Sequence, residues 1–264
     1  MIIEFSAAGL SEYVKNSNPI IRYLALRVYG NANGAIQRSL LNPPDGEYFK
    51  AKEILTVQGG VPDCKYRTDF QKNNPQNPIS ILYAGIIHES KGVMVLLKAI
   101  RLVRDQNYNF KLSIMGEFTS NAFKNKVQQF ISDNKLDDKV LLPGFKKGKD
   151  KWDQYNKADI FCFPTFYETE SFGLVIVEAM MFELPVITTN WRAIPDIVSD
   201  SETGFLIPIK NSEILAEKII LLISDSELRK KMGYAGREKY LNEFTMDRFV
   251  NRFELCVVET LKSN

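Results

Sequence analysis

The sequence predicts an α/β fold built on a doubly wound parallel sheet. From residue 79 onward, short apolar runs alternate with amphipathic segments, which is the pattern of parallel strands joined by crossover helices. Two runs, residues 79–84 (ISILYA) and 160–163 (IFCF), are almost wholly apolar, as expected for strands buried on both faces of a sheet. The chain has 264 residues, 45% of them hydrophobic, which is enough for one large domain or two small ones.

Composition narrows the class of protein. The net charge of +2 gives no electrostatic indication of a nucleic-acid partner. Cys64, Cys162 and Cys256 are far apart and the chain has one histidine, so we expect reduced thiols in a cytoplasmic protein and no zinc site. No apolar run approaches the roughly 18 residues of a membrane span, and the N-terminus lacks the basic region and cleavage site of a signal peptide.

The first 77 residues give weaker signals. Residues 1–5, 33–36 and 54–57 suit strands, and residues 19–29 suit a helix that begins at Pro19 and stops near Gly30. The apolar side and arginines of that helix fit an anionic membrane surface; the alternative is packing on the sheet. Residues 72–78 (KNNPQNP) are polar and proline-rich, which predicts an interdomain linker between residues 1–77 and 78–264.

The remaining elements follow from periodicity and from turn and capping signals. Strands are expected at residues 79–84, 110–115, 140–145, 160–163, 185–189 and 204–207, and helices at 93–105, 121–134, 151–157, 172–182, 212–223 and 246–261.

The loop between residues 163 and 173 is the candidate binding region. It joins the carboxyl end of a strand to a helix, which is where open α/β sheets bind ligands. Ser171 is the expected N-cap of that helix, and free backbone N–H groups around Gly173 would favour a phosphate. Glu170 in the loop and Glu178 two turns into the helix could accept sugar hydroxyls on either side of that phosphate. The alternative is a capped helix with a solvated acidic loop.

Lys91 stands at the start of another helix that follows a strand, so it could add a point charge to the same phosphate site. The alternative is a solvated lysine. His88 in the same loop is expected to be an ordinary loop histidine. A basic run at residues 146–151 is either a solvated loop or a region attracted to membrane phosphates.

Several motifs in order carry a family resemblance. Residues 170–174 (ESFGL), 178–180 (EAM) and 184–186 (LPV), continued by 193–198 (AIPDIV) and 203–206 (TGFL), resemble the donor-site motif of retaining GT-B glycosyltransferases of family 4, the glycosyl transferases group 1. The resemblance covers about residue 79 to the C-terminus. It implies the Rossmann-like C-terminal half of a GT-B enzyme with a partial N-terminal α/β segment, and a last helix that crosses back onto that segment.

The resemblance also implies an activity. The chain is expected to be a hexosyltransferase-type glycosyltransferase that takes a sugar from a nucleotide-diphosphate-sugar donor with retention, in polysaccharide or glycoconjugate synthesis. No metal and no cofactor are implied. Lys91 and the backbone of Phe172, Gly173 and Leu174, beside Ser171, would neutralise the diphosphate as the sugar–phosphate bond breaks. Glu178 would hold the ribose, and Glu170 would hold the donor sugar and support an oxocarbenium-like state.

The resemblance also implies contacts at two more loops, and at one of them the sequence departs from the family's pattern. Gly144 and Phe145 stand where the family places the nucleobase; the alternative for Phe145 is a core aromatic. Gly85-Ile86-Ile87 stands where the family has Gly-Arg-Leu, and the missing arginine predicts weaker or altered donor binding.

The N-terminal part departs most. We expect its 77 residues to be too few for a doubly wound half with its own sheet, so most of the family's acceptor domain would be missing. Ser6 loosely takes the place of a family histidine. The expected partners are a nucleotide sugar, a carbohydrate or lipid-linked acceptor, and a possible separate acceptor-domain chain; the expected location is cytoplasmic, at the membrane periphery in one reading. The alternative function is a nucleotide-sugar-binding subunit or fragment that does not catalyse alone. A dehydrogenase or epimerase lacks support because G-x-G-x-x-G is absent.

Overall fold

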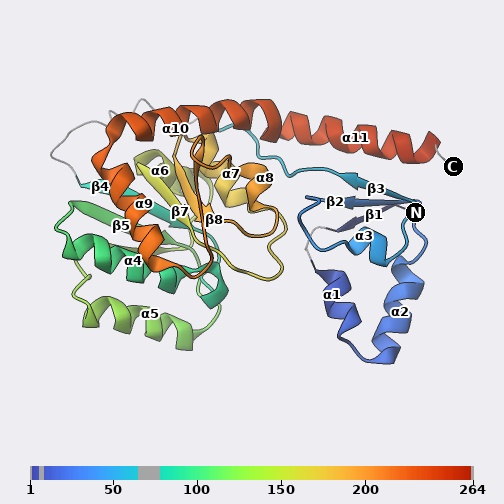
Figure 1. Ribbon diagram of the computed structural model, residues 1–264, viewed down its shortest axis with the longest axis horizontal. Coiled ribbons are helices and arrows are strands. Elements are labelled where there is room, and N and C mark those ends of the chain that lie inside the picture. The colour runs from blue at the N-terminus through green and yellow to red at the C-terminus, as the bar shows by residue number, and fades with distance from the viewer. Residues whose placement is uncertain (1, 6–8, 65–77, 263–264) are drawn as a thin grey trace.

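The computed structural model describes residues 2–5, 9–64 and 78–262, and these form a larger and a smaller α/β part lying side by side (Figure 1). The predicted linker at residues 72–77 and Ser6 lie outside the described residues.

The larger part is built on a six-stranded sheet in which every pairing is parallel. The strand order is β6-β5-β4-β7-β8-β9, so the chain winds outward in one direction from β4 and in the other from β7. This is the doubly wound arrangement that the sequence predicts, and its topological switch point lies between β4 and β7. The strands are β4 (Ile79–Ala84), β5 (Phe110–Met115), β6 (Val140–Gly144), β7 (Ile160–Phe163), β8 (Val186–Thr189) and β9 (Gly204–Ile207).

Helices cover this sheet and close one continuous core. The predicted helices are confirmed with small shifts at their ends, and one of these shifts arises because the cap of the helix after β7 is Gly173 instead of Ser171. The helices are α4 (Val93–Asp105), α5 (Asn121–Asp133), α6 (Gly148–Lys157), α7 (Leu174–Met181), α8 (Ile194–Ile197), α9 (Ser212–Ser224) and α10 (Ser226–Lys239), with the single turns η1 (Glu89–Lys91) and η2 (Tyr240–Phe244).

The smaller part has its own parallel sheet, in the order β1-β2-β3. The expected absence of a separate sheet is therefore wrong, because three four-residue strands joined by short helices form one, but its order runs in one direction and is not doubly wound. The elements are β1 (Ile2–Phe5), α1 (Leu10–Lys15), α2 (Pro19–Tyr29), β2 (Gly34–Gln37), α3 (Asp45–Tyr48) and β3 (Glu53–Thr56).

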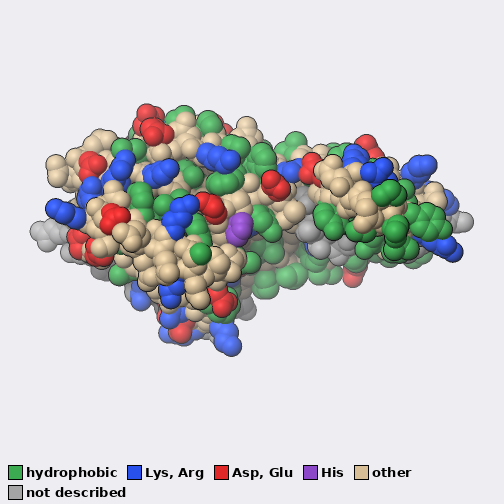
Figure 2. Space-filling view, turned by 90° about the horizontal axis from the view of Figure 1, so that it is seen from below, with side chains coloured by type: hydrophobic (Ala, Val, Ile, Leu, Met, Phe, Trp, Pro, Cys, Tyr) green, Lys and Arg blue, Asp and Glu red, His purple; other side chains and the backbone are tan. Residues whose placement is uncertain are grey.

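Helix α2 has the predicted bounds, with Asn18 capping its start. Its expected packing is realised only in part. Ala25 and Tyr29 pack against a small core around Phe49, but none of the residues of α2 is fully buried. Ile20 is 71% exposed, and Figure 2 shows hydrophobic and basic side chains mixed over this end of the molecule.

The last helix, α11 (Met246–Lys262), runs along both parts, which confirms the predicted crossing (Figure 1). Its Thr260 is buried against Gly34 of β2, where a Cβ on the glycine would lie 2.9 Å from the threonine methyl. Arg252 donates from Nη1 to Gln58 Oε1 at 2.6 Å. The described helices include none with the length and apolar character needed to cross a membrane.

Candidate functional site

The candidate site lies at the switch point, where the loops after β4 and β7 meet. Gly92, between η1 and α4, has φ of 80°, and a Cβ there would lie 2.0 Å from the carbonyl oxygen of Pro164. Only glycine allows this approach and this backbone conformation together. The contact brings Lys91 alongside the loop that follows β7.

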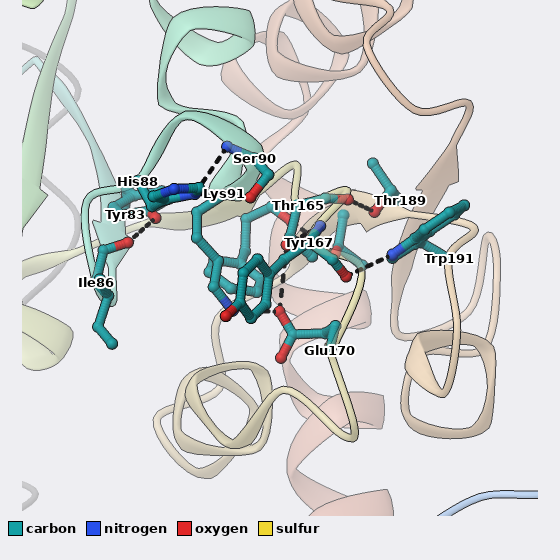
Figure 3. Close-up of polar contacts among 12 residues, drawn as sticks. Tyr83, Ile86, His88, Ser90, Lys91, Thr165, Tyr167, Glu170, Thr189 and Trp191 are labelled. Carbon is teal, nitrogen blue, oxygen red and sulfur yellow. Dashed lines mark hydrogen bonds and ion pairs between the residues drawn. The ribbon is translucent and has the colours of Figure 1, made fainter. Parts of the chain in front are cut away.

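Lys91 and Glu170 form an ion pair, with Nζ 2.7 Å from Oε2. Glu170 is 8% exposed, and Thr165 Oγ1 donates to the same carboxylate oxygen at 3.2 Å. The Lys91 ammonium also lies 4.2 Å from the centre of the Tyr167 ring. Figure 3 shows Lys91 reaching past this ring to Glu170. A buried carboxylate needs such partners, and the two predicted catalytic side chains supply them to each other.

Glu178 is held in a parallel way on the other side of α7. Lys151 Nζ lies 2.5 Å from Oε1, and the Tyr155 hydroxyl donates to Oε2 at 2.7 Å. Burial first, and then the Glu178 carboxylate, raise the pKa of Tyr155 well above its ordinary value of 10.0. Tyr155 therefore keeps its proton and acts as a donor to Glu178. This leaves Glu178 fixed in orientation next to the hollow that Lys151 lines.

The start of α7 differs from the prediction. The N-cap is Gly173, with φ of 81° and no side-chain cap, and Ser171 lies two residues before it in the loop. The left-handed conformation of Gly173 turns the chain into the helix, so the serine is not needed for that purpose. The first N–H groups of an eight-residue helix are thus left without a side-chain cap, which suits an anion.

Two hollows flank this helix start. One, of about 470 Å³, lies over the ends of β4 and β5; the other, of about 380 Å³, lies between the two parts of the chain. Val175 lines the first and Leu174 the second, so the beginning of α7 separates them. The first is lined by Ala84, Gly85, Ile86, Met115, Gly116, Glu117, Phe145, Lys146, Lys147, Gly148, Lys151, Trp152 and Val175. The second is lined by Arg38, Gly59, Gly60, Glu170, Ser171, Phe172, Gly173, Leu174 and Phe249.

The predicted site residues are divided between these hollows. Gly85 and Phe145 line the first, with Gly144 next to Phe145 at the end of β6. Phe145 is 67% exposed, so its alternative assignment as a core aromatic is wrong. The five predicted residues from 170 to 174 line the second hollow. Lys91 forms an ion pair with Glu170 in the lining of this second hollow. Glu178 forms an ion pair with Lys151, which lines the first hollow.

Sequence reasoning missed several side chains at this site. Lys151 belongs to the basic run interpreted as a solvated or membrane-facing loop, and Tyr155 lies in the predicted helix that follows it. Trp191 donates from Nε1 to the carbonyl of Tyr167 at 2.8 Å and fixes the β7 loop from the end of β8 (Figure 3). Arg38 comes from the smaller part. Of these, only Trp191 carried a signal, because it follows a predicted strand.

His88 is exposed, and its Nδ1 accepts a hydrogen bond from the Ser90 backbone N–H at 3.3 Å, so it caps the η1 turn. It also lines a third hollow with Tyr167 and Trp191. The expectation of a loop histidine agrees with this local role.

Comparison with known proteins identifies the class. The sequence model of the family described as "Glycosyl transferases group 1" matches residues 65–239, and the chain belongs to this family. The capsular polysaccharide biosynthesis glycosyltransferase CapM of Staphylococcus aureus is 35% identical over 164 residues, which is 62% of this chain and 41% of CapM. The N-acetyl-alpha-D-glucosaminyl L-malate synthase of Bacillus anthracis is 26% identical over 87% of this chain and 60% of its own length. This chain thus spans about half the length of such relatives.

Solved structures agree on the fold. HepE from Anabaena, crystallised with UDP, superposes on all of this chain and 72% of its own, with a TM-score of 0.82 at 19% identity. The C-terminal domain of the Francisella tularensis group 1 glycosyl transferase LpcC matches in full, over 71% of this chain, with a TM-score of 0.62 and 27% identity. The GT-B-type, Rossmann-like architecture predicted from the sequence is confirmed.

Proposed function

We propose that this chain carries the donor-binding half of a retaining glycosyltransferase. It would take a hexose from a nucleotide-diphosphate-sugar to a carbohydrate or lipid-linked acceptor in polysaccharide or glycoconjugate synthesis. Residues 78–264 would form the donor domain and residues 1–77 part of the acceptor domain. The supporting relatives include CapM and the colanic acid biosynthesis glycosyltransferase WcaL of Escherichia coli, by their names enzymes of surface polysaccharides.

One observation carries the proposal: two buried carboxylates, each held by a lysine, stand on either side of an uncapped helix start at the switch point of the sheet. The helix start and Lys91 would bind the diphosphate. When Lys91 turns to the phosphates, Glu170 would become free to accept hydrogen bonds from the sugar hydroxyls. Glu178, oriented by Tyr155, would accept hydrogen bonds from the ribose hydroxyls, and the nucleobase would stack on Phe145.

At the reacting carbon, the bond between the anomeric carbon and the phosphate oxygen breaks, and the diphosphate takes the electron pair. The positive charges and N–H groups around it stabilise that leaving group where charge develops. Glu170 lines the hollow between the two parts of the chain, and it would orient the sugar as positive charge develops at the anomeric carbon. The acceptor hydroxyl then bonds to the anomeric carbon and gives its proton to the oxygen of the departing diphosphate.

The test is calorimetric titration with UDP, GDP and ADP without added metal. If the natural chain binds one of these nucleotides, Glu178→Gln should abolish or strongly weaken that binding. The reason is that an amide oxygen accepts a weaker hydrogen bond from a hydroxyl than a carboxylate does. Glu168→Ala is the matched control, since Glu168 is an exposed acid in the same loop as Glu170. A folded chain that binds none of the three nucleotides would refute the proposal.

The matching sugar nucleotide would then be tested for hydrolysis and transfer, with the anomeric product followed by NMR. Retention predicts a product of the donor's own anomeric configuration. Binding without any turnover would favour the alternative, in which this chain is a nucleotide-sugar-binding subunit that requires a separate acceptor chain.

We place the protein in the cytoplasm, at the surface of the membrane through α2. Its exposed Ile20, Leu24 and Val28 lie on the same helix as Arg22 and Arg27, which suits an anionic interface. Sedimentation with anionic vesicles, compared with neutral ones, should pull down the natural chain but not an Ile20→Ser, Leu24→Ser variant. Equal sedimentation of both proteins would contradict this placement.

A further inference from the structure

The hollow between the two parts contains an arginine that sequence reasoning did not assign. Of the described residues that line it, Arg38 is the only one with a cationic side chain. The lining also includes Glu170 and the backbone turn at Gly173 and Leu174. Arg38 therefore borders the hollow from the smaller part, while the helix start borders it from the larger part.

The guanidinium of Arg38 is held in place before any ligand arrives. Arg38 comes directly after β2, and its Nη1 donates to the carbonyl of Val57 at 3.2 Å. Its central carbon lies 5.1 Å from the centre of the Phe249 ring on α11. A guanidinium stacked on an aromatic ring and bonded to backbone keeps its planar fork in one orientation, which lowers the entropy cost of gripping a phosphate.

The segment around Arg38 is fixed to the larger part close to the site. Ser39 Oγ donates to the Asp196 carboxylate, and Asn42 Nδ2 donates to the carbonyl of Ser171 at 2.8 Å. Ser171 lies in the loop that leads into α7. The distance between Arg38 and the helix start is thus set by two direct contacts and not only by the chain between them.

On the Glu170 side of the helix start, the larger part offers little positive charge for a diphosphate. Lys91 is already paired with Glu170, and the nearby position 86 holds an exposed isoleucine. A diphosphate bound at the start of α7 carries more charge than one lysine neutralises. We propose that Arg38 binds the distal phosphate of the donor nucleotide and so supplies, from the smaller part, a cation besides Lys91 on the Glu170 side of the site. This inference rests on the proposed function.

The test compares a nucleoside diphosphate with its monophosphate. Calorimetry would measure UDP and UMP, or the pair with whichever base the natural chain binds, for the natural chain, Arg38→Gln and Arg38→Lys. Because a hydrogen bond to a charged group is lost, Arg38→Gln should lower the affinity for the diphosphate about tenfold or more and change the affinity for the monophosphate by no more than about twofold. Arg38→Lys keeps the charge but not the planar fork, so its affinity for the diphosphate should lie between those of the natural chain and Arg38→Gln.

Arg252→Ala is the matched control, because Arg252 also joins the two parts but does not line the hollow. It should bind both nucleotides as the natural chain does. An equal loss of both nucleotides in Arg38→Gln, no loss, or the same loss in Arg252→Ala would overturn the inference while leaving the proposed function standing. Failure of the natural chain to bind any nucleotide would instead refute the proposed function and, with it, this inference.

Discussion

The pair of Lys151 and Glu178 allows a stability prediction that depends on its partial burial. Lys151→Met removes the ammonium and leaves the carboxylate, 11% exposed, with the Tyr155 hydroxyl as a hydrogen-bond donor. Breaking a fully buried pair costs about 3–5 kcal/mol, and an exposed pair contributes about 0–1 kcal/mol. The lysine is 24% exposed, so we expect an intermediate cost of about 1–2 kcal/mol, because water still reaches one side of the pair.

A double-mutant cycle measures the pair itself. Glu178→Gln should also destabilise the chain, and the double variant should be less destabilised than the sum of the two single variants by about 1 kcal/mol. Each kcal/mol corresponds to a fall in melting temperature of about 2–4 °C for a domain of this size class. Melting would be followed by near-UV circular dichroism, which reports the packing of Trp152 and Tyr155.

The same helix provides the control for this cycle. Lys149 pairs with Asp153 at 3.4 Å and is 75% exposed, so Lys149→Ala should change the free energy of unfolding by no more than about 0.5 kcal/mol. Additive effects of Lys151→Met and Glu178→Gln, within about 0.3 kcal/mol, would refute the reasoning that the pair is a coupled, half-buried unit.

Further predictions concern the glycines and the buried thiol. Gly92→Ala should destabilise the chain by at least about 2 kcal/mol, because it adds a backbone clash to a left-handed φ. Gly144→Ala has open space around it, so it should cost only the conformational term of about 1–2 kcal/mol. Equal melting temperatures of the two variants would contradict this. Burial raises the pKa of the Cys162 thiol above its ordinary value of 9.0, so the unfolded chain releases this proton first and stability should fall as pH rises through 9. Denaturant midpoints between pH 8 and 10.5 check this, with Cys162→Ala as a variant that should show a shallower fall; a midpoint that rises with pH would contradict it. Native thiol labelling should modify Cys162 last.

The strands and helices of the larger part could be predicted because each apolar run is bounded by a residue with a local effect. Residues 160–163 end at Pro164, and the helix over residues 93–105 follows Gly92. The helix start at Gly173 could not be fixed so well, because Ser171 and Gly173 are both plausible ends by local rules. The choice was made by the conformation of the loop, which depends on tertiary contacts such as the one between Asn42 and Ser171.

Of the candidate site, both carboxylates and Lys91, the partner of Glu170, could be predicted from the sequence, but the side chains that hold Glu178 could not. Glu170 and Glu178 are recognisable by their place around a strand–loop–helix unit. The partners Lys151 and Tyr155 come from α6, and which side chain of α6 faces α7 depends on how the helix packs on the sheet. Arg38 lies farther still from the motif in sequence, and only the docking of the two parts brings it to the hollow.

The position of α11 has a consequence for how the molecule is assembled. A ribosome makes β1, β2 and β3 early, but Thr260, which fills the space beside Gly34, is among the last of these 264 residues to leave the ribosome. Contacts between segments so distant in sequence form slowly, because a long loop must close before they are made. The small sheet therefore lacks its contact with α11 while the larger part is synthesised. The hollow that contains Arg38 is completed only when α11 packs against it. In a nascent chain, the Lys91 side of the proposed nucleotide site would form before the Arg38 side.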